Sequence, residues 1–231
     1  MSYNEDETVE QIKAWWARYG TPVLLSMAVV LLSFSGWRYW STGTLEDATQ
    51  AQALQQQMTS AMQRVSVNSD DKAANTDLQR LGQQLIAEYA KTPYAVDAAL
   101  LLAKRAVDSG DLAAAEKQLR TALDLKPSAE IKLLVQTRLA RVLAARKQYP
   151  AALAVLDDAD ADAAAAPLVA EIRGDILLLQ GQRDAAAKAY VAADAALAAR
   201  DEARPLLDLK LADVGMTPAR RASDLAAEVQ P

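Results

Sequence analysis

The pattern of hydrophobic and polar positions divides the 231-residue chain into two parts. Near the N-terminus, no charged residue occurs between Arg18 and Arg38, and the stretch from residue 23 to residue 34 is apolar apart from two serines. A transmembrane helix needs about 20 predominantly apolar residues. The pattern therefore predicts a transmembrane helix over residues 20–40.

Aromatic residues stand at both ends of this segment, namely Trp15, Trp16, Trp37, Tyr39 and Trp40. At 1.5 Å per residue, a helix from Trp16 to Trp37 is about 32 Å long, which matches a hydrocarbon core of about 30 Å. Tryptophan and tyrosine are enriched at the two membrane interfaces. These five side chains are therefore predicted to lie at the membrane surfaces.

Two alternatives to the membrane span are a helix buried in a protein core and a cleaved signal peptide. A helix buried in a protein core has no reason to carry aromatic residues at both ends. A cleaved signal peptide begins with a positively charged segment, whereas residues 1–19 contain four acidic residues against Lys13 and Arg18. An uncleaved membrane anchor is the favoured interpretation.

The orientation of the span depends on a margin of one positive charge. Lys13 and Arg18 precede the span, Arg38 follows it, and the next basic residue is Arg64. The positive-inside rule places residues 1–19 in the cytoplasm and the remainder of the chain outside, in the periplasm of a bacterium with two membranes.

After the span, apolar residues recur at helical spacing over about 45–66 and 75–91. The polar stretch 67–72 separates these two predicted helices. Residues 41–72 are therefore interpreted as a juxtamembrane helix and linker.

From about residue 93 onward, the sequence repeats itself. Gly110, Lys147 and Gly181 stand at equivalent turns between Ala- and Leu-rich segments, at steps of 37 and 34 residues. Helix–turn–helix units with a period of about 34 residues are typical of tetratricopeptide repeats. We predict an all-α fold, in which a single N-terminal transmembrane helix is followed by a tetratricopeptide-like α-solenoid over residues 73–215. A generic Ala-rich helical bundle is the alternative.

Paired helices in such a solenoid require small residues where their backbones approach, and here a larger residue follows four positions on. The predicted contact set is Ala103, Ala140, Gly174, Ala115, Ala152, Ala186, Leu119, Leu156, Tyr190, Ala122, Ala159 and Ala193. Beyond these units, Pro205 and four following leucines predict a short capping helix, and residues 216–231 are interpreted as a C-terminal tail.

Composition narrows the chemistry. The chain has no Cys and no His, which excludes disulfides, thiolate nucleophiles and histidine-based catalysis. A net charge of -5 argues against nucleic acid as a partner. Asp158, Asp160 and Asp162 alternate as in a calcium loop, but Ala163 and Val169 stand where that loop needs Gly and Glu. We therefore predict no catalytic residue, no cofactor and no metal site.

The repeat pattern favours a protein that binds its partners in a groove and not an enzyme. Stacked helix pairs form a concave surface lined by the first helix of each pair. The repeat alignment predicts that five side chains point into this groove: Lys104, Thr137, Arg141, Glu171 and Asp175.

These features together resemble a known family. The acidic N-terminus, the single span, the motif Gly36-Trp37-Arg38-Tyr39-Trp40 and the repeats with Arg138-Leu139-Ala140-Arg141-Val142 and Arg173-Gly174-Asp175 are similar to the YfgM family over residues 5–215. The resemblance implies a single-pass inner-membrane protein of Gram-negative bacteria with periplasmic repeats. It also implies an ancillary subunit of the SecYEG translocon that works with the chaperone PpiD.

The leading hypothesis is a membrane-anchored, non-enzymatic interaction module that helps to pass unfolded exported proteins to periplasmic chaperones. One alternative is a structural scaffold for envelope or cell-division complexes. Another is a regulator that acts through its cytoplasmic N-terminus, residues 1–18. An enzyme remains the most distant alternative.

Overall fold

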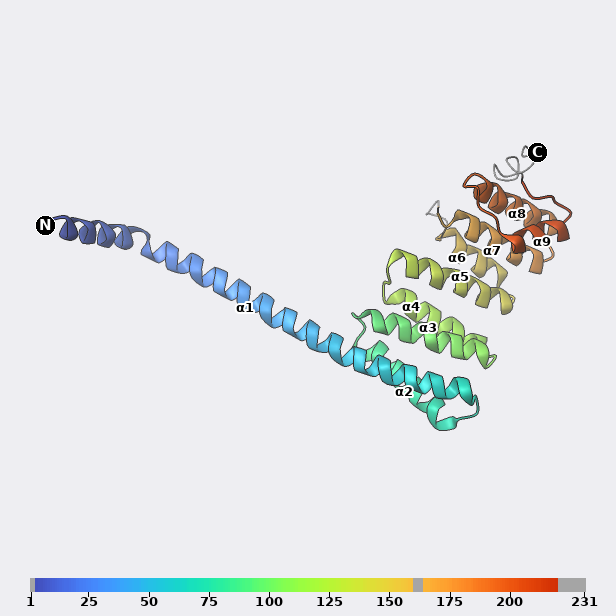
Figure 1. Ribbon diagram of the computed structural model, residues 1–231, viewed down its shortest axis with the longest axis horizontal. Helices are drawn as coiled ribbons and strands as arrows, with labels where there is room; N and C mark the ends of the chain where they lie inside the picture. Colours follow the sequence, from blue (N-terminus) through green and yellow to red (C-terminus); the bar gives the residue numbers. More distant parts are fainter. Residues whose placement is uncertain (1–2, 160–163, 220–231) are drawn as a thin grey trace, which may run out of the picture. The chain divides into compact units, whose positions relative to one another are not determined.

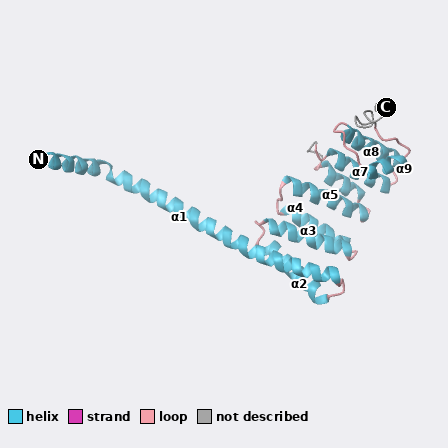
Figure 2. Cartoon of the chain, in the orientation of Figure 1, coloured by secondary structure: helices cyan, strands magenta, loops and turns pink. Residues whose placement is uncertain are grey.

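The computed structural model describes residues 3–159 and 164–219, and these residues form helices and no strand (Figure 1, Figure 2). The all-α prediction is thus confirmed over the described residues. The helices are α1 Tyr3–Val67, α2 Lys72–Glu88, α3 Pro93–Asp108, α4 Leu112–Asp124, α5 Ala129–Ala145, α6 Tyr149–Asp157, α7 Ala166–Leu179, α8 Arg183–Ala198 and α9 Pro205–Asp213.

The chain divides into two compact units, residues 1–52 and residues 53–231. In the first unit, the described residues belong to α1. Among the residues that the structure describes, no helix combines the length and the apolar character needed to cross a membrane. The transmembrane helix predicted at 20–40 is therefore unconfirmed.

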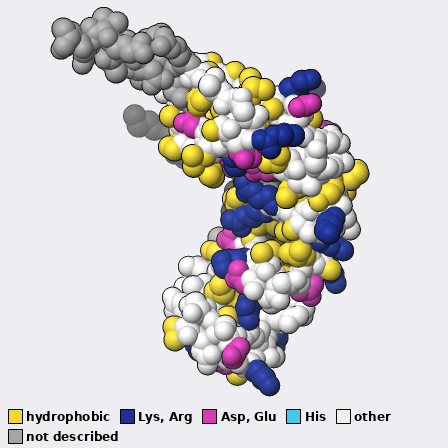
Figure 3. Space-filling view, turned by 90° about the vertical axis from the view of Figure 1, so that its right-hand side faces the viewer, with side chains coloured by type: hydrophobic (Ala, Val, Ile, Leu, Met, Phe, Trp, Pro, Cys, Tyr) yellow, Lys and Arg dark blue, Asp and Glu magenta, His cyan; other side chains and the backbone are white. Residues whose placement is uncertain are grey.

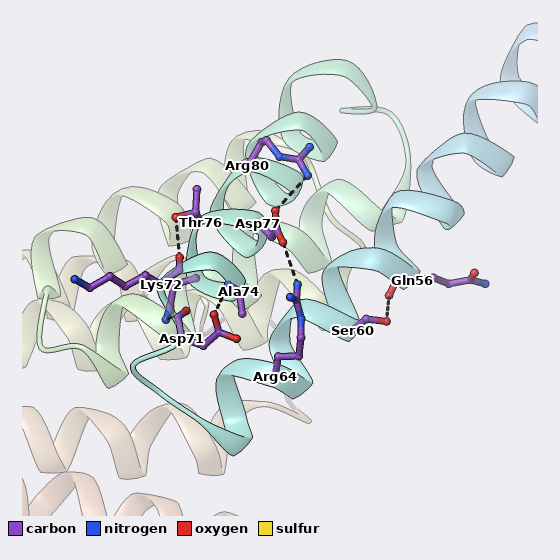
Figure 4. A network of polar contacts seen from close by, with 10 residues as sticks. Gln56, Ser60, Arg64, Asp71, Lys72, Ala74, Thr76, Asp77 and Arg80 are labelled. Carbon is purple, nitrogen blue, oxygen red and sulfur yellow. Dashed lines mark hydrogen bonds and ion pairs between the residues drawn. The ribbon is translucent and has the colours of Figure 1, made fainter.

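The second unit, here called the repeat unit, begins with the last part of α1, which packs against α2. Met58 is fully buried, and its terminal methyl group lies beside Gly82 of α2. At the surface of the same pair, Arg64 donates to Asp77 at 3.0 Å (Figure 4). The sequence predicted helices at about 45–66 and 75–91. The first lies within α1, and the second begins three residues earlier, at Lys72, and ends at Glu88.

The next helices form pairs that stack in chain order. Helix α3 packs against α4, α5 against α6 and α7 against α8, and each pair also contacts the next one (Figure 1). One hydrophobic core runs from α3 to α7, and a smaller one joins α8 to α9. This arrangement confirms the predicted tetratricopeptide-like stack of helix pairs.

The turns inside the pairs repeat one hydrogen-bond pattern. At the first turn, Gly110 N–H donates to Val107 O and Asp111 N–H donates to Ala106 O, both at 2.9 Å. The same two bonds recur at Lys147 and at Gly181. All three residues have positive φ, of 81°, 60° and 82° respectively, which glycine adopts without strain and lysine does not. The same two bonds also recur at Asp201, after α8, and at Gly215, 34 residues after Gly181.

The small-residue positions predicted from the repeat are buried. All twelve residues of the predicted contact set are buried, including both members of the pair Gly174 and Tyr190. A Cβ added at Gly174 would lie no more than 3.0 Å from three atoms of the Tyr190 ring. Glycine is therefore required there because the aromatic ring occupies the space of a side chain.

The predicted capping helix is confirmed as α9, which buries Leu207 and Leu211. Of the predicted tail, the structure describes residues 216–219. Within that segment the backbone N–H of Ala219 donates to the carboxylate of Asp194, which is buried in α8. The first residues after α9 are thus bonded to the repeat unit.

Candidate functional site

The five predicted groove residues lie on the first helices of three consecutive pairs. Lys104 is on α3, Thr137 and Arg141 are on α5, and Glu171 and Asp175 are on α7. Four of them fall into two groups, Lys104 with Arg141 and Glu171 with Asp175, and Thr137 belongs to neither.

Lys104 and Arg141 line one hollow between α3 and α5, which we call the α3–α5 hollow. It has a volume of about 330 Å³. Its floor is apolar and consists of Leu100, Ala103, Val107, Leu119 and Val142. Its remaining lining residues are the cations Lys104, Arg138 and Arg141. In Figure 3, Lys and Arg side chains gather in the middle of one face of the repeat unit, next to hydrophobic side chains.

The two arginines of this hollow differ from the others nearby. Among the residues that the structure describes, neither Arg138 nor Arg141 has a hydrogen bond or an ion pair, and Lys104 pairs with Asp108 at 2.6 Å. Every other described arginine of the repeat unit is bonded, either to a carboxylate or to backbone or amide oxygens. The hollow therefore holds two guanidinium groups whose donors face solvent.

The side chains of Thr137 and Glu171 do not line an open surface as predicted. Thr137 is 2% exposed, and its hydroxyl donates to Leu134 O at 3.0 Å within its own helix. Glu171 is 6% exposed. Both positions were assigned from the repeat alignment, which does not show what covers the first helix in each pair.

Glu171 is covered by the end of the stack. Its carboxylate accepts from Arg204 and from Lys210 of α9, both at 2.7 Å. Lys210 also pairs with Asp175 at 2.7 Å, and Asp175 accepts from the Tyr190 hydroxyl at 2.9 Å. These bonds connect α7, α8 and α9, so the second group of predicted groove residues belongs to an internal polar network.

This network shifts the pKa values of two of its members. Burial alone would raise the pKa of Glu171, but the hydrogen bonds from Lys210 and Arg204 outweigh it and lower that pKa below its ordinary value of 4.5. Burial and the hydrogen bond to Asp175 raise the pKa of the Tyr190 hydroxyl well above its ordinary value. The folded chain therefore favours a charged Glu171 and a neutral Tyr190.

Arg138 is a residue that the groove prediction missed, although the sequence held a signal for it. No Asp or Glu lies within four residues of either Arg138 or Arg141. In a helix, partners for a charged side chain are found three or four positions away. Two arginines on one helix without such an acid are therefore expected to keep their donors free.

The N-terminal aromatic side chains that the structure describes are half-exposed. Trp15 and Trp16 are each 51% exposed, and the rings of Tyr19 and Trp15 are tilted by 40° with their centroids 5.9 Å apart. The side chains of Trp37, Tyr39 and Trp40 lie outside the described residues. Further along the first unit, five apolar side chains are 55–73% exposed: Met27, Val29, Val30, Leu31 and Leu32.

No metal-binding group is found among the residues that the structure describes, where no three carboxylates come together to hold an ion. Asp160 and Asp162 of the aspartate series lie outside the described residues, so the rejected calcium loop is not tested by this result.

The repeated helix pairs and the solvent-facing hollow define a helical-repeat protein of the kind that binds other proteins. A family model described as a tetratricopeptide repeat-like domain matches residues 13–216, most of the chain. A comparison with solved structures finds no significant match.

Curated relatives identify the family more closely. The chain is 31% identical over 189 residues to the ancillary SecYEG translocon subunit of Escherichia coli K12, with 82% of this chain and 86% of the relative covered. It is 29% identical to the Haemophilus influenzae protein of the same name, with 82% and 88% covered. It is 26% identical to the Neisseria gonorrhoeae protein of that name, with 90% and 95% covered. The chain belongs to the family of ancillary SecYEG translocon subunits, which confirms the resemblance to the YfgM family.

Proposed function

We propose that this protein is a membrane-tethered interaction module of the bacterial protein-export channel. The observation that carries the proposal is the match to ancillary SecYEG translocon subunits over more than four-fifths of both chains. Their name assigns them to the SecYEG translocon, and a tetratricopeptide repeat-like family model matches this chain over residues 13–216.

The proposed tether is the segment 20–40. Support comes from the absence of charge between Arg18 and Arg38 and from the exposed apolar side chains of Met27, Val29, Val30, Leu31 and Leu32. Transfer of a large apolar side chain such as Leu32, which is 73% exposed, from water into lipid lowers the free energy. In this proposal Trp15 and Trp16, each 51% exposed, lie in the membrane interface before the span.

In this proposal the chain crosses the inner membrane once. Residues 1–19 lie in the cytoplasm, residues 41–72 connect the span to the repeats, residues 73–215 form the periplasmic interaction domain, and residues 216–231 form the tail. The positive charges before the span support this orientation.

The function in this proposal is to hold partners near the channel exit. A membrane tether raises the effective concentration of the repeat unit near the channel, so each contact with a partner can be weak. Unfolded exported chains that leave the channel would meet the repeat unit at once and pass from it to periplasmic chaperones, of which PpiD is the partner implied by the family resemblance.

The first test addresses the tether. We expect the full-length chain to stay with membranes after an alkaline carbonate wash, and a chain lacking residues 1–44 to be released. Because the chain contains no Cys, single cysteines at positions 4 and 60 report topology without background. Labelling of position 60 from outside intact cells is expected, and labelling of position 4 from outside would contradict the orientation.

The second test addresses the partners. A photoreactive residue at position 141 should give crosslinks to translocon or chaperone subunits or to an exported chain in transit. The same residue at position 188, an exposed position of α8, is the matched control. Recovery of none of these partners from a chain that is inserted in the membrane would contradict the proposal and favour the scaffold alternative.

A further inference from the structure

We propose that the α3–α5 hollow binds a short acidic peptide segment of a partner protein, in which one or two aliphatic side chains stand between carboxylates. This inference rests on the proposed function and deepens it, because it names the chemistry by which the module recognises its partner.

The first argument is the unpaired charge. The chain as a whole is acidic, with 30 Asp and Glu against 25 Lys and Arg. Nevertheless, Arg138 and Arg141 have no carboxylate partner among the residues that the structure describes, while Arg146, one turn further along the same helical stretch, pairs with Glu116. Two neighbouring guanidinium groups without carboxylate partners leave a local positive charge on an otherwise acidic protein. The carboxylates of an acidic partner would neutralise this charge.

The second argument is the floor of the hollow. Val107 is 44% exposed, and it lies with Leu100 and Val142 beneath the cations. A volume of about 330 Å³ is at the small end of the range for ligand pockets, so it suits one or two aliphatic side chains and not a whole helix. Burial of such a side chain contributes to the affinity, and the arginines around it bind the neighbouring carboxylates of the peptide.

The third argument comes from the other end of the same stack. On α7, the carboxylates of Glu171 and Asp175 are matched by Lys210 and Arg204 from the end of the chain. There the chain provides its own complementary charge, and the surface is closed. Between α3 and α5, Asp108 pairs with Lys104, and no acid that the structure describes pairs with Arg138 or Arg141, so this surface stays open.

A peptide fits this chemistry better than other anions. Guanidinium groups bind carboxylates through paired, directional hydrogen bonds. The apolar floor adds a requirement for an aliphatic side chain next to them, which a simple anion does not meet. A lipid headgroup is the competing source of negative charge, and the experiment separates it.

The experiment measures fluorescence anisotropy of a labelled peptide Gly-Asp-Glu-Leu-Leu-Asp-Glu-Gly with the full-length chain in detergent. We expect saturable binding that weakens when salt rises from about 50 mM to about 500 mM. Peptides with Ser in place of Leu, or with Asn and Gln in place of Asp and Glu, should bind at least about tenfold more weakly.

Variants of the chain locate the site. Arg138→Glu and Arg141→Glu should each weaken binding about tenfold or more. Lys188→Glu makes the same charge change on the exposed face of α8 and should leave binding unchanged. Val107→Ser tests the floor without changing the charge, and circular dichroism establishes that each variant is folded.

If the wild type binds the peptide, three results would still overturn the inference. The first is that it binds the Ser peptide as tightly as the Leu peptide, and the second is that Lys188→Glu weakens binding as much as the two arginine variants do. The third is that soluble short-chain phosphatidylglycerol displaces the labelled peptide as efficiently as unlabelled peptide does. Co-purification of the Arg141→Glu chain with the translocon is measured in parallel. Absence of peptide binding by a wild-type chain that still co-purifies with the translocon removes only this inference. Intact peptide binding without co-purification by the wild type removes only the proposed function.

Discussion

At the scale of single residues, Gly174 and Tyr190 show how one contact fixes the distance between two helices. The ring of Tyr190 fills the place that a side chain at position 174 would occupy, and both residues are buried. The other two pairs use Ala with Leu at these positions. A larger residue on one helix is thus matched by a smaller residue on the other.

Gly174→Ala is therefore expected to destabilise the repeat unit by about 1–3 kcal/mol, because an added methyl group in a full core forces neighbours apart. The measurement is the free energy of unfolding in urea. As a control, the same change in a Tyr190→Ala background should cost clearly less, because the ring is gone. An equal cost in both backgrounds would show that the ring is not the cause.

Glu171 gives a second residue-level prediction, on pH dependence. Its folded-state pKa lies below the ordinary 4.5, because Lys210 and Arg204 favour the charged form despite burial. Its contribution to stability is thus fully present above pH 4.5 and is lost as the pH falls through the lower folded-state pKa.

Glu171→Gln should cost about 1–3 kcal/mol near neutral pH, where it removes a hydrogen-bonded charge from a buried position. The difference from the wild type should shrink at about pH 3.5. Asp108→Asn, which breaks an exposed pair with Lys104, is the matched control and should have an effect below about 1 kcal/mol. A Glu171→Gln difference that stays constant with pH would contradict this account.

At the scale of helices, the turns inside the pairs have the same backbone conformation but differ in the N-cap of the helix that follows. Asp111 caps α4, and its side chain accepts from Ala114 N at 2.9 Å. Gln182 has nearly the same backbone angles at the start of α8, φ -90° and ψ 66° against -82° and 77°, but makes no side-chain cap.

Asp111→Ala should therefore destabilise the chain by about 1 kcal/mol, and Gln182→Asp should stabilise it by about 0.5–1 kcal/mol. Thermal unfolding followed by circular dichroism measures both changes. Gln182→Glu adds the same charge on a longer side chain, so it separates the hydrogen bond of the cap from the attraction of the helix N-terminus. If Glu and Asp stabilise equally, the cap bond contributes nothing at this turn.

The sequence was sufficient for features that recur and insufficient for contacts made once. The helix pairs and their buried small residues were predictable because the same spacing appears three times. The covering of Glu171 was not, because Arg204 and Lys210 stand 33 and 39 residues away, after the last repeat. The free arginines were partly predictable, since the absence of nearby acids is a local property of α5.

At the scale of the whole molecule, the repeat unit begins at residue 53, inside α1, and so includes residues that precede the repeat domain predicted from residue 73. Met58 and Val65, both buried, lie in the part of α1 that belongs to this unit. A fragment 53–231 should therefore unfold in a single cooperative transition.

A fragment 73–231, which follows the predicted boundary, should be less stable than 53–231 by at least about 3 kcal/mol, because it loses two buried side chains worth about 1.5–3 kcal/mol each. A fragment 41–231 is the control and should match 53–231. Equal stability of the two shorter fragments in urea would place the boundary at residue 73 after all.

The guanidinium groups of Arg138 and Arg141 have one more consequence. Arginine keeps its charge at any acidity that a living cell meets, and the chain has no His to titrate near neutrality and no Cys to oxidise. Attraction at the hollow is then insensitive to acid stress until the partner's own carboxylates take up protons near pH 4. It is sensitive to ionic strength throughout. Binding at this surface is therefore expected to change with ionic strength, and to be independent of redox potential and of pH above about 4.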